Sequence, residues 1–219
     1  MFPLRDIIPS RTTPYITITI IALNALAWFY EVSLPSDTLQ RFLQIYGVVP
    51  ADFHAPTLIT SMFLHGSWSH ILGNMWYLWI FGDNVEDRFG HFGFVVFYLF
   101  CGIAAAAGQI LMNSGSMLPT IGASGAIAGV MGAYFVMYPQ SRVLTLVPIV
   151  FYFDIIELPA IALLGFWFLM QLFSAGAVAA TAGTGGGVAF AAHVAGFLVG
   201  MGVAYVLRRR DPRWDLDRG

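Results

Sequence analysis

Residues 122–139 have the sequence GASGAIAGVMGAYFVMYP, an uncharged and largely apolar stretch that carries Gly125 and Gly129 four residues apart. A second apolar stretch, AHVAGFLVG at residues 192–200, carries Gly196 and Gly200 at the same spacing. Small residues at this spacing let two membrane helices pack with their backbones close together. The two stretches therefore predict a pair of helices that meet through glycine faces.

The composition places this pair in a membrane protein. Hydrophobic residues make up 58% of the 219 residues and charged residues 10%, whereas soluble domains carry about 25% charged residues. The net charge of −2, without a basic stripe, gives no support for nucleic-acid binding. The single cysteine, Cys101, excludes an internal disulfide and a metal site built from several cysteines.

Hydropathy predicts an all-α fold, a six-transmembrane-helix bundle over residues 14–207, between a short N-terminus (1–13) and a basic tail (208–219). The second and fourth spans are short for a crossing of about 20 residues, so a polar cavity is expected above them. The long loop at 31–64 should include a short interfacial helix at 38–46. The expected spans are 14–30, 69–81 with a possible extension to 88, 92–112, 124–138, 158–177 and 188–207.

The arginines predict the orientation, since the chain has no lysine. With six spans, every arginine except Arg41 falls on the side of the two termini. Positive residues favour the cytoplasmic side, so both termini are expected in the cytoplasm.

Ser124 and His193 are expected at the same depth. They lie roughly 21 Å and 22 Å from the cytoplasmic ends of their helices. In a bilayer core about 30 Å thick, both side chains should lie roughly 10 Å below the extracytoplasmic face. A serine and a histidine at matched depth suggest nucleophilic chemistry, with His193 as the base.

His70 and Asn74 are spaced i, i+4, so one helix face presents both. If the second span ends at Asp83, His70 lies about 20 Å from the cytoplasmic side and Asn74 one turn deeper, so both could meet Ser124 and His193 in one layer. With the Ser124 backbone N–H they could stabilise a tetrahedral oxyanion. The soluble-hydrolase motif Gly-x-Ser-x-Gly is absent, since residue 126 is Ala. No acid is well placed to orient His193, so the sequence predicts a dyad rather than a triad.

At these positions the chain resembles the rhomboid intramembrane serine proteases. The resemblance implies Ser124 as nucleophile, His193 as general base, and His70 with Asn74 as oxyanion-hole donors. Gly122, Gly125 and His65 are the expected substrate-binding residues. The matching motifs are His65, HILGN at 70–74, EDRFG at 86–90, GASG at 122–125 and AHVAG at 192–196.

The same resemblance implies cleavage of transmembrane proteins near small residues, in a lipid bilayer, without metal or cofactor. The expected location is a prokaryotic plasma membrane, with the active site towards the extracytoplasmic side. The oligomeric state is left open.

Two positions depart from the family pattern. Pro56-Thr57 stand where many members carry Trp-Arg, and Ala128 stands where some members place an aromatic ring against the catalytic histidine. Another side chain must then hold the ring of His193, and the sequence does not identify it.

Two other functions remain as alternatives. A non-catalytic relative that binds transmembrane helices would have no need of both Ser124 and His193. A transporter with His70 and His193 as a proton relay is disfavoured because inverted repeats and an intramembrane carboxylate are not evident.

Overall fold

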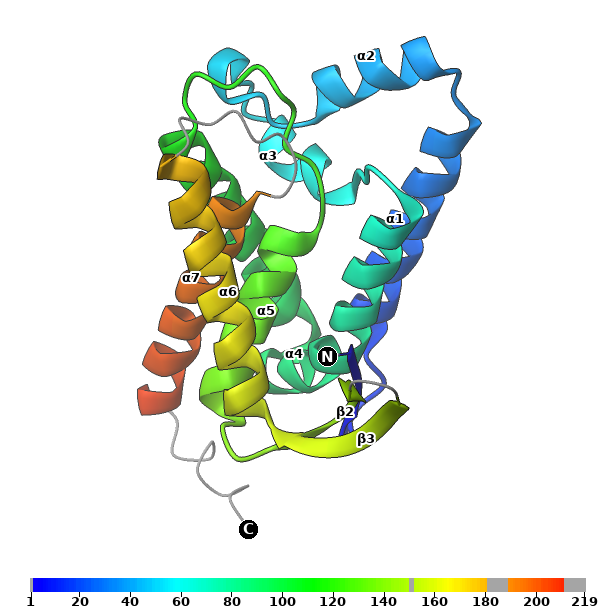
Figure 1. Cartoon of the computed structure of the whole chain (residues 1–219). Helices are drawn as coiled ribbons and strands as arrows, with labels where there is room; N and C mark the ends of the chain where they lie inside the picture. The colour runs from blue at the N-terminus through cyan, green and yellow to red at the C-terminus, as the bar shows by residue number, and fades with distance from the viewer. Residues whose placement is uncertain (1, 150–151, 181–188, 211–219) are drawn as a thin grey trace.

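The computed structural model describes residues 2–149, 152–180 and 189–210. The part of the predicted basic tail beyond residue 210 lies outside these ranges. Figure 1 shows a helical bundle with a small sheet at one end. The helices are α1 (Tyr15–Ser33), α2 (Ser36–Tyr46), η1 (Pro50–Asp52), α3 (Thr57–Thr60), η2 (Ser61–Phe63), α4 (Trp68–Met112), α5 (Ser124–Met137), α6 (Ala160–Ala180) and α7 (Phe190–Arg210); the strands are β1 (Phe2–Asp6), β2 (Arg142–Ile149) and β3 (Tyr152–Pro159).

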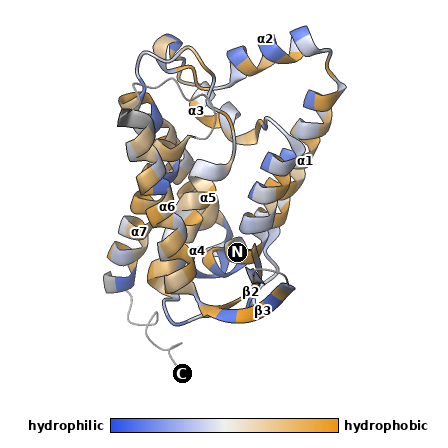
Figure 2. Cartoon of the chain, viewed as in Figure 1, coloured by the Kyte–Doolittle hydropathy of each residue, from blue (hydrophilic) through white to orange (hydrophobic). Residues whose placement is uncertain are grey.

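Four helices among the described residues, α1, α4, α6 and α7, are long and apolar enough to cross a membrane. Many of their apolar side chains point outward, including Leu26 and Phe29 on α1 and Phe173 on α6. Figure 2 shows this hydrophobic colouring along the sides of the bundle. Because a soluble protein rarely exposes so much apolar surface, these sides are suited to contact with lipid.

Helix α4 is 45 residues long and contains two helical segments that meet at Gly90. Gly90 has φ 69° and ψ 160°, which a glycine adopts without the steric cost of a Cβ. The first segment runs well past residue 81, so the prediction of a short second span is wrong and its possible extension to 88 is correct. Helix α5 has 14 residues and is the short apolar helix that was expected in the fourth position.

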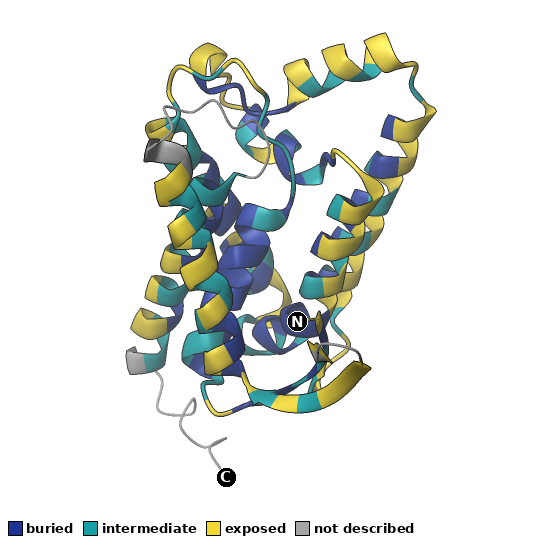
Figure 3. Cartoon of the chain, viewed as in Figure 1, coloured by how far each residue is buried: buried dark blue, intermediate teal, exposed yellow. Residues whose placement is uncertain are grey.

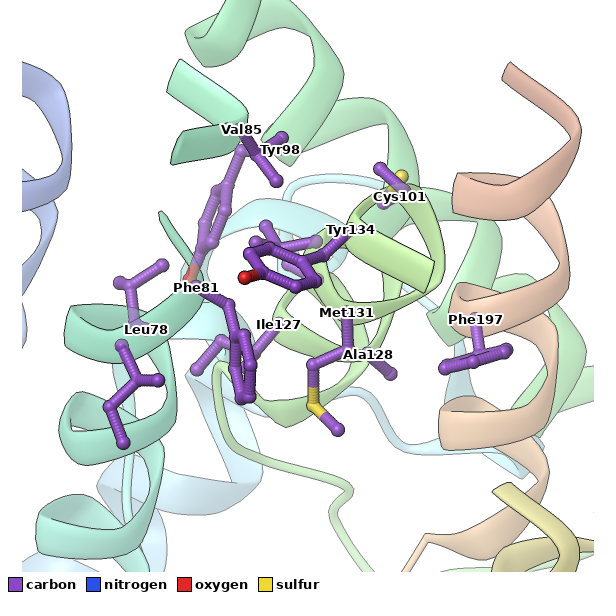
Figure 4. Packing of buried hydrophobic residues seen from close by; sticks show 14 of the residues in the cluster. Leu78, Phe81, Val85, Tyr98, Cys101, Ile127, Ala128, Met131, Tyr134 and Phe197 are labelled. Atoms are coloured by element: carbon purple, nitrogen blue, oxygen red, sulfur yellow. The ribbon is translucent and has the colours of Figure 1, made fainter. Parts of the chain in front are cut away.

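Helix α5 forms the centre of the bundle and is buried over most of its length. Figure 3 shows it dark blue among helices whose outer faces are yellow. Around the C-terminal half of α5, Phe81, Met131 and Tyr134 pack with other residues of α4, α5 and α7, as Figure 4 shows. Cys101 belongs to this core, and its side chain fills the space beside Gly129 that a Cβ on that residue would need.

Glycines allow α5 and α7 to lie in backbone contact. A Cβ added to Gly196 would collide with the carbonyl oxygen of Gly125, and one added to Gly200 would collide with that of Gly129. The glycine faces predicted from the sequence therefore meet. This packing brings the first turn of α7 beside the first turn of α5.

A buried carboxylate joins α1 to α4. Glu86 accepts hydrogen bonds from the backbone N–H groups of Ile16 (3.0 Å) and Thr17 (2.8 Å), in the first turn of α1. It also contacts His91 Nδ1 at 2.6 Å. A negative charge at a helix N-terminus is favourable, because the first N–H groups there have no partner within the helix.

The sheet was not predicted, so the all-α expectation needs correction: the described chain is mostly helical with an added three-stranded antiparallel sheet, in the order β1-β2-β3. Strand β1 pairs Phe2 with Leu146, and β2 pairs Arg142 with Pro159 at the start of the β2–β3 hairpin. The Tyr134 hydroxyl, near the end of α5, donates to Asp6 at 2.7 Å. The sheet thus closes the bundle at the C-terminal end of α5, opposite to Ser124.

Candidate active site

Ser124 is the first residue of α5, and the chain enters this helix through Gly122. Gly122 has φ +123°, a conformation that other residues rarely adopt. Its N–H donates to the Ser61 carbonyl at 2.9 Å, which fixes the approach to the helix. As the first helical residue, Ser124 has a backbone N–H with no acceptor earlier in the helix.

His193 lies in the first turn of α7, and its side chain is 8% exposed. Its Nε2 lies 2.7 Å from Ser124 Oγ, a hydrogen-bond distance. The structure therefore brings together the serine and the histidine that were predicted at matched depth.

The other side of the His193 ring contacts α6. Nδ1 lies 2.7 Å from Gln171 Oε1. Trp167, one turn earlier on α6, lies beside the imidazole with ring centroids 5.8 Å apart and an interplanar angle of 38°. Gln171 and Trp167 are therefore neighbours of the His193 ring, where the sequence identified no such side chain because residue 128 is Ala.

His70 and Asn74 project from the start of α4. Ser67 caps this helix by accepting the His70 backbone N–H at 3.2 Å. His70 Nδ1 accepts the Gly66 N–H at 3.3 Å, so in the neutral ring Nε2 carries the proton. A Cβ on Gly122 would lie 2.8 Å from His70 Nε2 and 3.7 Å from Asn74 Nδ2. Two N–H donors therefore gather beside the residue that leads into Ser124.

His65 occupies a different place from the one expected. It is 1% exposed and is not among the residues that line the cavity described below. Its Nε2 lies 3.0 Å from Asn74 Nδ2, and its backbone N–H donates to the buried carboxylate of Glu31 at 3.2 Å. Contact between His65 and substrate is therefore not supported, because His65 lies behind Asn74 as its hydrogen-bond partner.

A cavity of about 1220 Å³ opens above these groups. Ser124 and His193 line it together with His70, Asn74 and Trp167. Its remaining wall is partly polar and includes Ser67, Ser69, Gln109, Asn113, Ser114 and Ser116. The polar cavity expected from the sequence is present, although only one of the two adjacent helices is short.

A second, small cavity of about 30 Å³ lies beside Ser124. Gly122, Gly125 and Ala192 are among the residues that line it. A methyl-sized group fits such a space. Among the described residues, no three His, Cys, Asp or Glu side chains lie close enough together to hold a metal ion.

Comparison with known proteins identifies the family of the chain. The Rhomboid domain family model matches residues 53–210. Similar proteins include "Rhomboid-like protein 11, chloroplastic" of Arabidopsis thaliana (31% identical over 114 residues, covering 48% of this chain and 39% of the relative). "Putative rhomboid protease YdcA" of Bacillus subtilis is 30% identical over 130 residues, covering 58% of this chain and 64% of the relative.

"Rhomboid protease GluP" of Bacillus subtilis is 32% identical over 133 residues, covering 59% of this chain and 26% of the relative. The matched segments thus span less than two thirds of each of these relatives. The family model, by contrast, covers most of the present chain. With the helical bundle and its apolar spans, this match establishes that the chain is a membrane protein of the rhomboid family.

Proposed function

We propose that the protein is an intramembrane serine endopeptidase that hydrolyses peptide bonds in or near transmembrane segments of other proteins. The observation that carries this proposal is the 2.7 Å contact between Ser124 Oγ and His193 Nε2 at the base of a partly polar cavity. A hydroxyl beside a buried imidazole, with N–H donors nearby, is the arrangement that acyl transfer needs.

In the first half of the reaction, His193 Nε2 accepts the Ser124 proton while Oγ attacks the scissile carbonyl carbon. The carbonyl oxygen becomes an oxyanion, and the donors available to it are His70 Nε2–H, the Asn74 amide and the Ser124 backbone N–H. The protonated His193 then gives its proton to the leaving amine. The C–N bond breaks, and the substrate's acyl group remains on Ser124.

In the second half, a water molecule attacks the ester carbonyl and His193 accepts a proton from it. The intermediate collapses, the acid product leaves, and Ser124 recovers its proton from His193. Water is scarce in a bilayer core, and the cavity with its polar wall offers it a route to the ester.

The proposed topology has six spans: α1, the two segments of α4, then α5, α6 and α7. Both termini and the sheet lie in the cytoplasm, because Arg5, Arg11, Arg142 and Arg208 then gather on that side. The cavity opens towards the opposite, extracytoplasmic face of the plasma membrane. Substrates are membrane proteins with a small residue before the cut, which the 30 Å³ cavity beside Ser124 can accommodate.

The test is labelling of the detergent-solubilised protein with a fluorophosphonate probe, together with a cleavage assay on a transmembrane substrate. The parent protein should be labelled at Ser124 and should cut the substrate. Ser124→Ala and His193→Ala should do neither, while their unfolding midpoints stay near that of the parent. Turnover by either variant at the parental rate would rule out the proposed dyad, and substrate binding without labelling would favour the non-catalytic alternative.

A further inference from the structure

A histidine that acts as a base through Nε2 must carry its proton on Nδ1. The two tautomers of neutral imidazole are close in energy in water, so the partner of the other nitrogen decides which one is present. In the soluble triads this partner is a carboxylate. Among the described residues, no acidic side chain forms a hydrogen bond with His193, and Nδ1 instead lies 2.7 Å from Gln171 Oε1.

An amide oxygen can only accept a hydrogen bond. Its contact with Nδ1 therefore requires the N–H to be on Nδ1, which leaves the lone pair of Nε2 facing Ser124. Without an acceptor, the buried Nδ1–H of His193 would be unpaired, which is energetically costly. The oxygen of Gln171 therefore stabilises the Nδ1–H tautomer relative to the Nε2–H tautomer.

A neutral amide at position 171 is less costly to bury in the bundle than a charged acceptor would be. An ionised carboxylate in an apolar helix pays a large desolvation penalty. A glutamine supplies an acceptor without that penalty, and its dipole remains directed at the ring when His193 becomes positively charged during the reaction.

Trp167 completes the arrangement from the same helix face. Positions 167 and 171 are one turn apart on α6. Trp167 lies beside the ring of His193, while Gln171 forms a hydrogen bond with its Nδ1. Together they restrict rotation of the imidazole.

We propose that Gln171 is the positioning residue for His193: its side-chain oxygen selects the Nδ1–H tautomer and aims Nε2 at Ser124. The inference rests on the proposed protease function. It extends the Ser124–His193 dyad by a third, uncharged residue, Gln171, which takes up no proton and acts only through His193.

The test compares Gln171→Leu, which removes the acceptor, with Gln171→Glu, which keeps an oxygen at the same reach. Asn24→Leu serves as the control, because it removes a buried amide from α1 without touching His193. Gln171→Leu should lower kcat and the rate of fluorophosphonate labelling about tenfold, the weight of one net hydrogen bond, with KM little changed. Gln171→Glu should recover part of this loss, and Asn24→Leu should retain the parental kcat.

A second measurement reads the tautomer without any turnover. The protein labelled with ¹⁵N-histidine has five such residues, and the His193→Gln variant identifies the signal of His193. The parent should show the Nδ1–H form, and Gln171→Leu should show a mixture of both tautomers. This spectrum can be taken in the Ser124→Ala background, so it also serves if a variant is inactive.

The outcomes separate the two proposals. Equal kcat and an unchanged His193 tautomer in Gln171→Leu would overturn the positioning role and leave the protease function standing. A parent protein that neither cuts nor labels, but whose His193 tautomer still depends on Gln171, would overturn the protease function and leave the positioning role intact.

Discussion

Asn74 and His65 form a pair in which an imidazole fixes the direction of an amide. His65 Nε2, 3.0 Å from Asn74 Nδ2, accepts one amide hydrogen and leaves the second for another acceptor. Because His65 is buried and its backbone is held by Glu31, the amide has a firm support. A donor that is fixed before the reaction stabilises a developing charge without further reorganisation.

Asn74→Ala should therefore lower kcat by up to about 10²-fold and change KM little, since an oxyanion donor acts mainly in the transition state. Steady-state kinetics on a transmembrane substrate give both constants. An unchanged kcat with a raised KM would assign Asn74 to substrate positioning instead.

Sequence reasoning pointed to Ser124 and His193 because polar groups in apolar spans are few and the depths of these two can be counted. The depth count for His70 and Asn74 assumed a second span that ends near residue 83, whereas the helix runs on to Gly90, so their selection depended on the i, i+4 spacing and on the family resemblance.

Sequence reasoning could not locate the partner of His193, because the rotation of α6 about its axis depends on packing with α7. A signal existed: Gln171 is a lone amide in an apolar helix, one turn from Trp167. A single amide in an apolar helix favours a hydrogen bond to a neighbouring helix, but it does not identify the residue that it meets.

The contact between α5 and α7 depends on glycines that face the opposite backbone. The same contact sets the distance between Ser124 and His193, since each side chain lies in the first turn of its helix. Wider separation of the two helices should therefore lower stability and catalysis together.

Gly200→Ala should reduce the free energy of unfolding by about 1–3 kcal/mol, because the added methyl collides with the Gly129 carbonyl oxygen. Gly202→Ala is the matched control on the same helix, since a Cβ there meets nothing within 4 Å. This control should gain up to about 1 kcal/mol from its higher helix propensity. The free energy of unfolding of both variants is measured in detergent. Equal values for Gly200→Ala and Gly202→Ala would contradict the predicted collision.

The sheet shows what a hydropathy reading overlooks. Residues 142–149 and 152–159 are two runs with several β-branched and aromatic residues, but the two positions between them are Val150 and Phe151 and not the Asn, Asp or Gly that signals a hairpin turn. Hydropathy predicts no element for residues 139–157, which lie between the fourth and fifth expected spans. The pairing of β1 with β2 was harder to predict, because it joins residues about 140 positions apart.

Asp6, at the end of β1, should make stability depend on pH. Burial raises the pKa of its carboxyl from 3.8 to about 6, although Tyr134 donates a hydrogen bond to it. The folded state thus binds this proton more tightly than the unfolded state, so the stabilisation is full below about pH 4 and is lost as pH rises through about 6.

Asp6→Asn keeps an oxygen for Tyr134 and removes the titration. Unfolding midpoints of both proteins between pH 4 and 7 should show the parent losing stability relative to the variant as the pH rises. A difference between them that does not vary with pH would contradict the raised pKa.

The whole molecule has a polar cavity at one end and a sheet at the other, with α5 between them. In the proposed orientation, Ser124 lies roughly 10 Å below the extracytoplasmic face. A regular substrate helix hides its carbonyl groups in its own hydrogen bonds, so it must unwind before Ser124 can attack.

Cleavage is therefore expected in the outer third of a substrate span, after a small residue such as Ala. Gly or Pro just beyond the cut should raise the rate, because they lower the cost of unwinding. Mass spectrometry of the products, from substrates with those residues replaced by Leu, measures both effects. Cuts in the cytoplasmic half, or rates that ignore helix stability, would contradict the orientation and the mechanism.

The buried position of Cys101 has a practical consequence. It is the chain's single cysteine, and its side chain is fully enclosed in the core. A membrane-impermeant maleimide should therefore react only with a cysteine introduced at a chosen surface site. In intact cells Ser36→Cys, on α2, should be labelled, whereas Tyr152→Cys, on β3, should be labelled only after the membrane is opened. Because Cys101 itself does not react, the labelling shows which side of the membrane each end of the bundle faces.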